Sequence, residues 1–510
     1  MADFPARNPV TEAALHSSIT KIMKDYSDNK AQPSSKASIY RVPQKLRKLK
    51  ESAYTPRIVS IGPYHEHDER LKDMEYHKKT YMHSLLSRVR DEPNQPADAA
   101  IKVITDMILE EVAHARSCYA ASHKLNDDVR FAEMLLVDGC FILELLYRRE
   151  KTDHPKNGDP ILGNTSVFLE VRHDLLLLEN QIPMFVLQAL FDFGLVQTST
   201  LRNLINNFFG NMLNFELQMR EDVKTETTAY ILGFLHDCCL PRDTAASEQK
   251  NTNQIIKHSA IDLERAGDCC LPRDTAASEQ KEPNQIIKHS AIDLNRAGVY
   301  FKVGTRGDQI CVNFSTSCGF SFLGGTSRGG TSDNNPKRCI YDRTNSRRCC
   351  YSWFFQFCGR TNFEIPKLCI YDSTESFLRN LIAFEQCSPS IPRHITSYAF
   401  LMDTLINTKE DVEVLEKAGV LENHLGASED ATRLFNTICK EVVLGEFTFR
   451  KQWHDVEEYR SMNSARVRRS YAELKSYYVS NRWAFISVIA ALTLFTLQVI
   501  QTIYTVRSSY

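Results

Sequence analysis

The sequence predicts a mainly α protein: a large helical body with a short insertion rich in strands and loops, and one C-terminal transmembrane helix. Three observations predict it. Long stretches on both sides of the middle place apolar residues three and four apart, which is the period of an amphipathic helix. Residues 300–366 are rich in glycine, serine and cysteine, which indicates short strands and loops. Residues 483–506 form an uncharged apolar run.

The composition is that of a folded protein without a strong global charge. The 510 residues are 43% hydrophobic, so the chain can bury a large core. Lysine and arginine number 62 against 63 for aspartate and glutamate, so we expect no nucleic-acid partner. The first 30 residues contain no apolar run of the length that a secretory signal requires. The 15 cysteines follow no regular framework, which predicts mostly reduced thiols.

The chain divides into segments of different character. We expect, in order, a loosely ordered arm (1–37), the first half of the helical body (38–236), a tandem duplicated segment (237–298), a cysteine- and glycine-rich strand and loop segment (299–366), the second half of the helical body (367–460), a basic juxtamembrane segment (461–482), the transmembrane helix (483–506) and a short tail (507–510).

The middle of the chain contains repeats. Residues 237–267 recur almost unchanged at 268–298, and KRCIYD at 337–342 is echoed by KLCIYD at 367–372. Two copies are fewer than a solenoid needs to bury a continuous face. A recent duplication or a faulty gene model therefore explains the tandem copy better than a functional array does.

Helix boundaries can be placed at two points. VRHDLLLLENQIPMFVLQALFDFG predicts a mostly buried helix that is kinked or interrupted at Pro183, because proline lacks an amide donor and disfavours helix at the preceding residue. Ser428, followed by Glu429 and Asp430, predicts a helix start with negative charge at the positive end of the helix dipole. We expect the helices of the second half to pack back onto the first.

Residues 483–506 are predicted to cross a membrane. As a helix, these roughly 24 residues would extend about 36 Å, against an apolar bilayer core of about 30 Å. Aromatic residues stand at both ends, as at membrane interfaces. The residues expected to contact lipid include Trp483, Phe485, Leu492, Phe495, Leu497, Ile500, Ile503 and Tyr504. Gln498 and Gln501 lie three residues apart, where they could bond a second helix, so helix–helix self-association stays open.

A basic flank sets the expected orientation. It comprises Arg466, Arg468, Arg469, Lys475 and Arg482, whereas Arg507 alone follows the run. The excess of cations before the span predicts a cytosolic N-terminal body, and the short tail after it predicts a single-pass, tail-anchored protein. We expect the plasma membrane rather than an endomembrane. The flank either lies against anionic head groups or serves as an ordinary stop signal.

Four acidic residues lie in strongly apolar helical surroundings: Asp138, Glu144, Asp174 and Glu179. An unpaired buried charge costs several kcal/mol, so each carboxylate must find a partner. Together they could provide acid–base catalysis if they converged in a pocket without basic partners. Salt-bridged packing would contradict that interpretation.

Basic residues near these carboxylates favour structural pairing instead. Arg148, Arg172 and His173 supply neighbouring positive charge. His173 precedes Asp174 directly, and we expect the two side chains to diverge on a helix rather than form a catalytic dyad. No phosphate-binding loop, serine elbow or kinase signature occurs, so we predict no catalytic residues.

A histidine and two cysteines near residue 237 raise the possibility of a metal site. His236 lies near Cys238 and Cys239, but structural zinc sites usually space their cysteines two to four residues apart, and adjacent cysteines chelate one ion poorly. We therefore expect neither a metal nor a cofactor.

Several sequence blocks occur in a recognisable order: YRVP at 40–43, AYTPRIVSIGPYH at 53–65, MEYHK at 74–78 and IPKLCIYDSTESFLRNLIAFEQC at 365–387. Together they resemble the plant family called domain of unknown function 247. The resemblance covers about 39–506 and implies a mostly helical plant protein that ends in one membrane span. The family as a whole has no assigned enzymatic activity. Some grass members are implicated as pollen determinants of self-incompatibility.

Three functional hypotheses follow. The leading one is a non-enzymatic, membrane-anchored protein whose helical body binds other proteins in signalling or recognition, with membrane lipid and unidentified proteins as partners. The second is a membrane-tethered enzyme that uses the buried acidic residues. The third is a receptor-like recognition protein with its body outside the cell, as in pollen self-incompatibility.

Overall fold

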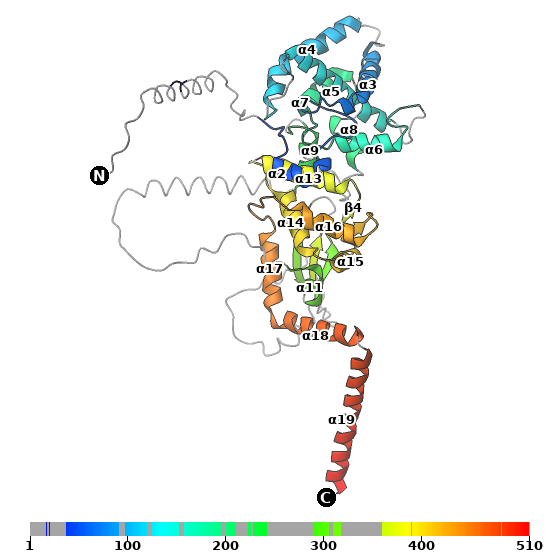
Figure 1. Ribbon diagram of the computed structural model, residues 1–510, viewed down its shortest axis with the longest axis vertical. Helices are drawn as coiled ribbons and strands as arrows, with labels where there is room; N and C mark the ends of the chain where they lie inside the picture. The colour runs from blue at the N-terminus through cyan, green and yellow to red at the C-terminus, as the bar shows by residue number, and fades with distance from the viewer. Residues whose placement is uncertain are drawn as a thin grey trace, which may run out of the picture.

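The computed structural model is mainly helical, as the sequence predicts (Figure 1). It describes residues 17, 20 and 37–508, apart from 91–96, 121–124, 126, 152–157, 196–199, 211–222, 224, 226–227, 242–288, 305–309, 318–359, 389 and 481. Most of the predicted N-terminal arm, most of the tandem copy and the whole motif at 337–342 fall on residues outside these ranges.

The first half of the body is a group of helices around α5. Its elements are α2 (Gln44–Leu49), η1 (Glu51–Ala53), η2 (Glu69–Leu71), α3 (Asp73–Arg90), α4 (Ala97–Ser117), α5 (Asp128–Glu150), α6 (Thr165–Asp174), α7 (Met184–Leu190), the π-helical η3 (Phe191–Leu195), α8 (Leu201–Phe209) and α9 (Ile231–Cys239). Helix α5 packs against α3, α4, α7 and α8, and nearly all of its residues from Phe131 to Leu146 are buried. Its apolar run explains this central position, because a helix that is apolar on most sides is stable only when it is surrounded.

The predicted helix around Pro183 is interrupted more widely than a kink requires. Helix α6 ends at Asp174, Pro183 stands at the cap position of α7, and residues 175–183 between them are irregular and buried. Buried main-chain groups need partners, and side chains provide them. The side-chain amide of Gln181 donates through Nε2 to the main-chain carbonyls of Leu175 (2.8 Å) and Leu177 (2.9 Å). These bonds let a non-helical segment lie inside the core.

A small sheet lies in the second half of the body. Helix α11 (Ala291–Arg296) leads into β1 (Val299–Val303), which pairs in parallel with β3 (Arg360–Ile365), and β2 (Asn313–Ser317) pairs antiparallel with the other edge of β3. A second sheet joins β4 (Leu368–Ile370) and β5 (Leu421–Asn423) in parallel.

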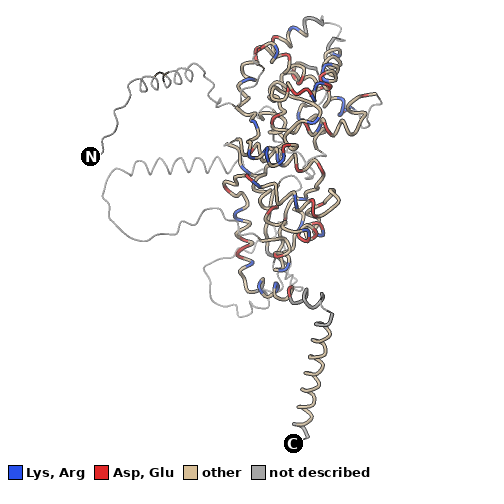
Figure 2. Tube along the Cα trace, viewed as in Figure 1, with Lys and Arg blue, Asp and Glu red and all other residues tan. Residues whose placement is uncertain are grey.

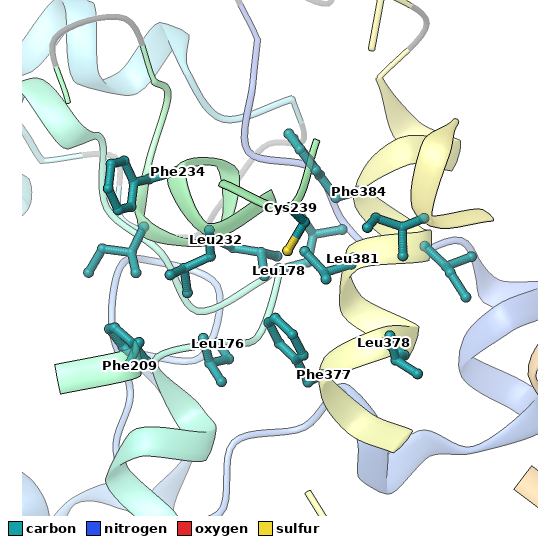
Figure 3. Close-up of a cluster of buried hydrophobic side chains, with 14 of the residues drawn as sticks. Leu176, Leu178, Phe209, Leu232, Phe234, Cys239, Phe377, Leu378, Leu381 and Phe384 are labelled. Carbon is teal, nitrogen blue, oxygen red and sulfur yellow. The ribbon is translucent and has the colours of Figure 1, made fainter. Parts of the chain in front are cut away.

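The helices of the second half pack back onto the first, as predicted. They are α13 (Thr374–Cys387), α14 (His394–Leu405), α15 (Lys409–Lys417), α16 (Ser428–Ile438) and α17 (Arg450–Ser461), and α16 begins at the predicted Ser428. Figure 3 shows Phe377, Leu381 and Phe384 of α13 facing Leu176, Leu178 and Leu232 of the first half. One hydrophobic core therefore runs through both halves.

Two helices end the chain. Helix α18 (Asn463–Ser480) follows α17, and α19 (Arg482–Ser508) leads away from the body (Figure 1). Charged residues of both signs are spread over the body, whereas α19 is almost entirely uncharged (Figure 2). Its described apolar side chains are exposed, among them Leu492 (59%), Phe495 (65%) and Ile503 (59%).

The predicted helix over 483–506 forms, but its assignment as a transmembrane helix is not supported. In the part of the chain that the structure describes, no helix combines the length and the apolarity that crossing a membrane demands. Helix α19 includes Gln498 and Gln501 and several threonines, such as Thr493 and Thr496, whose hydroxyls bond main-chain carbonyls one turn back. The predictions of a transmembrane helix and of a single-pass, tail-anchored protein are therefore not supported.

Candidate functional site

All four acidic residues that the sequence singles out are buried. Asp138 and Glu144 lie on α5, Asp174 ends α6, and Glu179 lies in the irregular segment before α7. Asp138 lines a small cleft of about 110 Å³ beside Lys78. The other three line neither this cleft nor the larger one between α13 and α16.

Asp138 pairs with a buried lysine. The Nζ atom of Lys78 on α3 lies 2.6 Å from Oδ1 of Asp138, and the amide of Gly62 donates to Oδ2 at 2.8 Å. Burial lowers the pKa of Lys78, but the carboxylates of Asp138 and Glu75 outweigh burial and raise that pKa above its ordinary value. Lys78 therefore keeps its charge beside Asp138, although burial raises the pKa of the Asp138 carboxyl above its ordinary value.

Asp174 binds main chain. Its carboxylate accepts hydrogen bonds from the amides of three successive residues, Arg57 (2.9 Å), Ile58 (2.8 Å) and Val59 (2.9 Å). Successive amides that point at one site form an anion-binding concavity, and here a side chain of the same protein occupies it. The carboxylate of Asp174 thus fixes the path of the segment after η1.

His173 contacts Asp174, so the prediction that these side chains diverge is wrong. Nδ1 of His173 lies 3.0 Å from Oδ1 of Asp174, and its Nε2 lies 2.9 Å from Oγ of Ser376 on α13. Both residues lie in the last turn of α6, and the rotamers of these two neighbouring side chains let the imidazole reach the carboxylate. The order serine, histidine, aspartate is that of a hydrolase triad. However, all three side chains are buried, and the Ser376 hydroxyl donates to the carbonyl of Ala53 at 2.8 Å.

Glu179 fastens the start of the body. Its Oε1 accepts from the amide of Val42 at 2.6 Å and lies 2.8 Å from Nη2 of Arg47 on α2. Burial raises the pKa of Glu179, but the neighbouring His65 and Arg47 and the amide of Val42 outweigh burial and hold that pKa below its ordinary value. Glu179 therefore stays ionised and holds α2 in place.

Glu144 pairs with two arginines. Nε of Arg148, one turn further along α5, lies 2.6 Å away, and Arg88 of α3 binds both carboxylate oxygens. Arg148 also reaches Asp159 at 2.8 Å. Arg148 was predicted as a counter-charge and acts as one. Arg172 does not; its guanidinium lies 5.4 Å from the ring centre of Phe168.

Ion pairs with lysine or arginine account for Asp138, Glu144 and Glu179, and main-chain amides account for Asp174. Three of the four carboxylates bind the main chain of residues 42–62, which we call the N-terminal segment. The arrangement fastens this segment to the first half of the body, and neither of the two described clefts brings the four carboxylates together.

A further buried pair was not predicted. Nε2 of His236 on α9 lies 2.9 Å from Oε1 of Glu385 on α13, and both are fully buried. Glu385 also accepts from the amides of Ile395 (2.8 Å) and Thr396 (2.7 Å) at the start of α14. The pair links three helices. In the sequence, His236 was considered only as a possible metal ligand. Within the described ranges, no group of three or more potential metal ligands gathers.

A cleft in the second half of the body was not predicted either. A cleft of about 490 Å³ lies between the end of α2, α13 and α16. Its charged lining residues come from three distant parts of the sequence, so no local motif indicates it.

The residues of the predicted basic flank differ in their exposure to solvent. Arg466 is exposed on α18, whereas Arg468 and Arg469 are half-buried. Nη1 of Arg468 donates to the hydroxyl of Tyr459 at 3.2 Å, which holds α18 against α17. The side chains of Lys475, Arg482, Trp483 and Phe485 lie outside what the structure describes.

Comparisons with known proteins agree with the ordered motifs. A family model described as a plant protein of unknown function, domain of unknown function 247, matches residues 39–497. UPF0481 protein At3g47200 of Arabidopsis thaliana is 24% identical over 474 residues, which cover 92% of this chain and 86% of that protein. Putative UPF0481 protein At3g02645 of the same plant is 24% identical over 515 residues, which cover 93% and 91%. No solved structure matches the chain.

Proposed function

The chain belongs to domain of unknown function 247, a family of plant proteins of unknown function, and we propose that it is a non-enzymatic protein that binds other proteins while α19 attaches it to a lipid surface. The observation that carries the proposal is the exposed apolar surface of α19. The pairing of the buried carboxylates supports the non-enzymatic part.

The apolar residues of α19 lie all round the helix. Ile486, Leu492, Phe495 and Ile500 are each about half exposed or more, and the helix leads away from the core that could cover it (Figure 1). Large contiguous apolar surfaces mark sites of contact with a protein or a membrane. Burying one such side chain contributes roughly 1.5–3 kcal/mol, so a few of them outweigh the cost of association.

Lipid is favoured as the occupant by the residues before α19. Helix α18 presents Arg466 to solvent and brings further arginines close to the same end of the body. A cation near an anionic membrane surface contributes about 1 kcal/mol. A basic helix followed by an apolar one therefore suits contact with an anionic bilayer surface.

Flotation of the purified full-length chain with vesicles of phosphatidylcholine and phosphatidylserine tests the attachment. The double variant Leu492→Asp with Phe495→Asp should float at least tenfold less, because two buried charges oppose insertion. Val443→Asp, at an exposed valine of the body (54%), is the matched control and should float normally. Equal flotation of all three proteins would refute lipid attachment through α19. Loss of flotation in high salt would instead assign the attachment to the basic residues of α18.

Proximity labelling in plant cells tests the protein-binding part. A labelling enzyme fused to the N-terminus should mark a reproducible set of proteins, and this set should shrink when α19 carries the two aspartates. Absence of reproducible neighbours would contradict the interaction role.

The side of the membrane is part of the same proposal. The eight described cysteines, which include the buried Cys118, Cys140, Cys238 and Cys239, are free thiols, and this supports a body on the reducing, cytosolic side. In sealed vesicles from plant cells, an N-terminal tag should be open to protease. A protected tag would instead favour the receptor-like hypothesis.

A further inference from the structure

The cleft between α2, α13 and α16 has walls of mixed charge. Its basic lining residues are Lys50, Arg379, Arg433 and Lys440, and its acidic ones are Asp372, Glu375 and Asp430. Its volume of about 490 Å³ falls in the range of small-molecule sites. Only the charges that are not already paired within the wall are available to a ligand.

Most of the negative charge is already neutralised. Glu375 binds both Lys50 and Nε of Arg379 (2.8 Å). Burial raises the pKa of Glu375, but Lys50 and Arg379 outweigh burial and hold that pKa below its ordinary value. Asp430 pairs with Arg433 at 3.0 Å. Two of the three carboxylates are therefore engaged within the wall.

Two cations keep binding capacity. Arg379 is 4% exposed, and its partners are Glu375, the hydroxyl of Thr437 at 3.3 Å and the hydroxyl of Tyr54. A guanidinium has five N–H groups, so these three partners do not use all of them, and Arg379 lines the cleft. Lys440 is exposed, and no carboxylate in the described ranges lies within ion-pair distance of it.

Two other features of the lining limit which ligand can fit: one unpaired carboxylate and two apolar side chains. Asp372 stands at the rim without a described basic partner, and it would repel a second negative charge. Leu49, which is 40% exposed, and Leu425 line the cleft as well. A fitting ligand has one anionic end and an apolar part.

We propose that this cleft binds a small organic anion, with its phosphate or carboxylate group on Arg379 and Lys440 and its apolar part against Leu49 and Leu425. Guanidinium groups take both kinds of oxyanion in a two-pronged geometry. Because the ligand would join α2 to α13 and α16, it would also tie the N-terminal segment to the second half of the body.

Isothermal titration calorimetry of the full-length chain in detergent tests the site with three probes: phenyl phosphate, benzoate and inorganic phosphate. We expect saturable binding of phenyl phosphate or benzoate, and at least tenfold weaker binding of inorganic phosphate, which lacks the apolar part. The stronger of the two aromatic probes identifies the anionic group. Saturable binding of none of the probes, or binding of inorganic phosphate as tight as that of the aromatic ones, would overturn the proposal.

Variants locate the site. Lys440→Glu should weaken binding at least tenfold and leave thermal unfolding unchanged, because Lys440 is exposed. Lys102→Glu, an exposed lysine of α4 far from the cleft, is the control for charge and should bind normally. Asp372→Asn should tighten binding, since it removes the repelling charge. Equal affinity of Lys440→Glu and Lys102→Glu for the probe would show that the anion binds elsewhere.

Discussion

Nε2 of His236 lies 2.9 Å from Oε1 of Glu385 inside the protein, where neither side chain contacts solvent. Burial lowers the pKa of His236, but its hydrogen bonds to Asp237 and Glu385 outweigh burial and raise that pKa to about 9 from an ordinary value of 6.5. An ion pair therefore joins α9 of the first half to α13 of the second.

This pair predicts a pH dependence of stability. The folded-state pKa of His236 is higher than the unfolded one, so the folded protein binds the extra proton between pH about 6.5 and about 9. The stabilisation is fully present below pH 6.5 and is lost as pH rises through 9. Urea unfolding of Glu385→Gln should depend less on pH in this window than that of the natural chain. Glu446→Gln, at an exposed carboxylate, should keep the natural slope; equal slopes in all three would refute the pair.

Asp174 predicts a large loss of stability when its charge is removed. In Asp174→Asn one oxygen is replaced by an NH₂ group, which faces amide donors of residues 57–59 and cannot accept from them. We expect the free energy of unfolding to fall by roughly 2–4 kcal/mol. Asp372→Asn, at an exposed aspartate, should change it by less than about 0.5 kcal/mol. Chemical denaturation measures both, and similar losses would contradict the role of Asp174.

Gly62 predicts a steric effect. Its φ is +72°, and a Cβ atom there would lie 2.5 Å from the carbonyl oxygen of Gln181. Gly426 has φ +97° and no atom within 4 Å of its Cβ position, so Gly426→Ala measures backbone strain alone, about 1–2 kcal/mol. Gly62→Ala should cost clearly more in thermal unfolding, because the Gln181 carbonyl must move. Equal costs would mean that the N-terminal segment shifts freely.

Ser376 predicts a negative result. Its hydroxyl is buried and donates to Ala53, so a fluorophosphonate probe should not label it in the folded chain, despite the neighbouring His173 and Asp174. Mass spectrometry of the probed protein measures this. Labelling of Ser376 that disappeared in His173→Gln would establish a hydrolase and displace the non-enzymatic proposal.

Sequence patterns predicted the features that depend on local spacing. The buried position of α5, the break before Pro183 and the start of α16 at Ser428 all follow from residues close to one another in the chain. The need for partners at the four carboxylates was also predictable, because it follows from burial alone. The identity of most partners was not, since Lys78 and Arg88 lie on another helix than Asp138 and Glu144.

Three features required the fold itself. His236 and Glu385 are 149 residues apart, and the cleft that Arg379 and Lys440 line draws on three separate stretches of chain. The contact of His173 with Asp174 depends on the rotamers of two neighbouring side chains in the last turn of α6, which the spacing of residues does not determine. Apolarity predicted a helix over 483–506, which forms, whereas the described part of the chain holds no helix that could cross a membrane.

The binding of the N-terminal segment by later carboxylates has a consequence during synthesis of the chain. Gly62, Arg57 and Val42 leave the ribosome 76, 117 and 137 residues before Asp138, Asp174 and Glu179 respectively. At 5–20 residues per second, the segment waits roughly 4–27 s for the side chains that bind it. During that interval its amides are satisfied by water and its apolar residues are open to chaperones. The part of the body that is made first is therefore completed only after α6 has emerged.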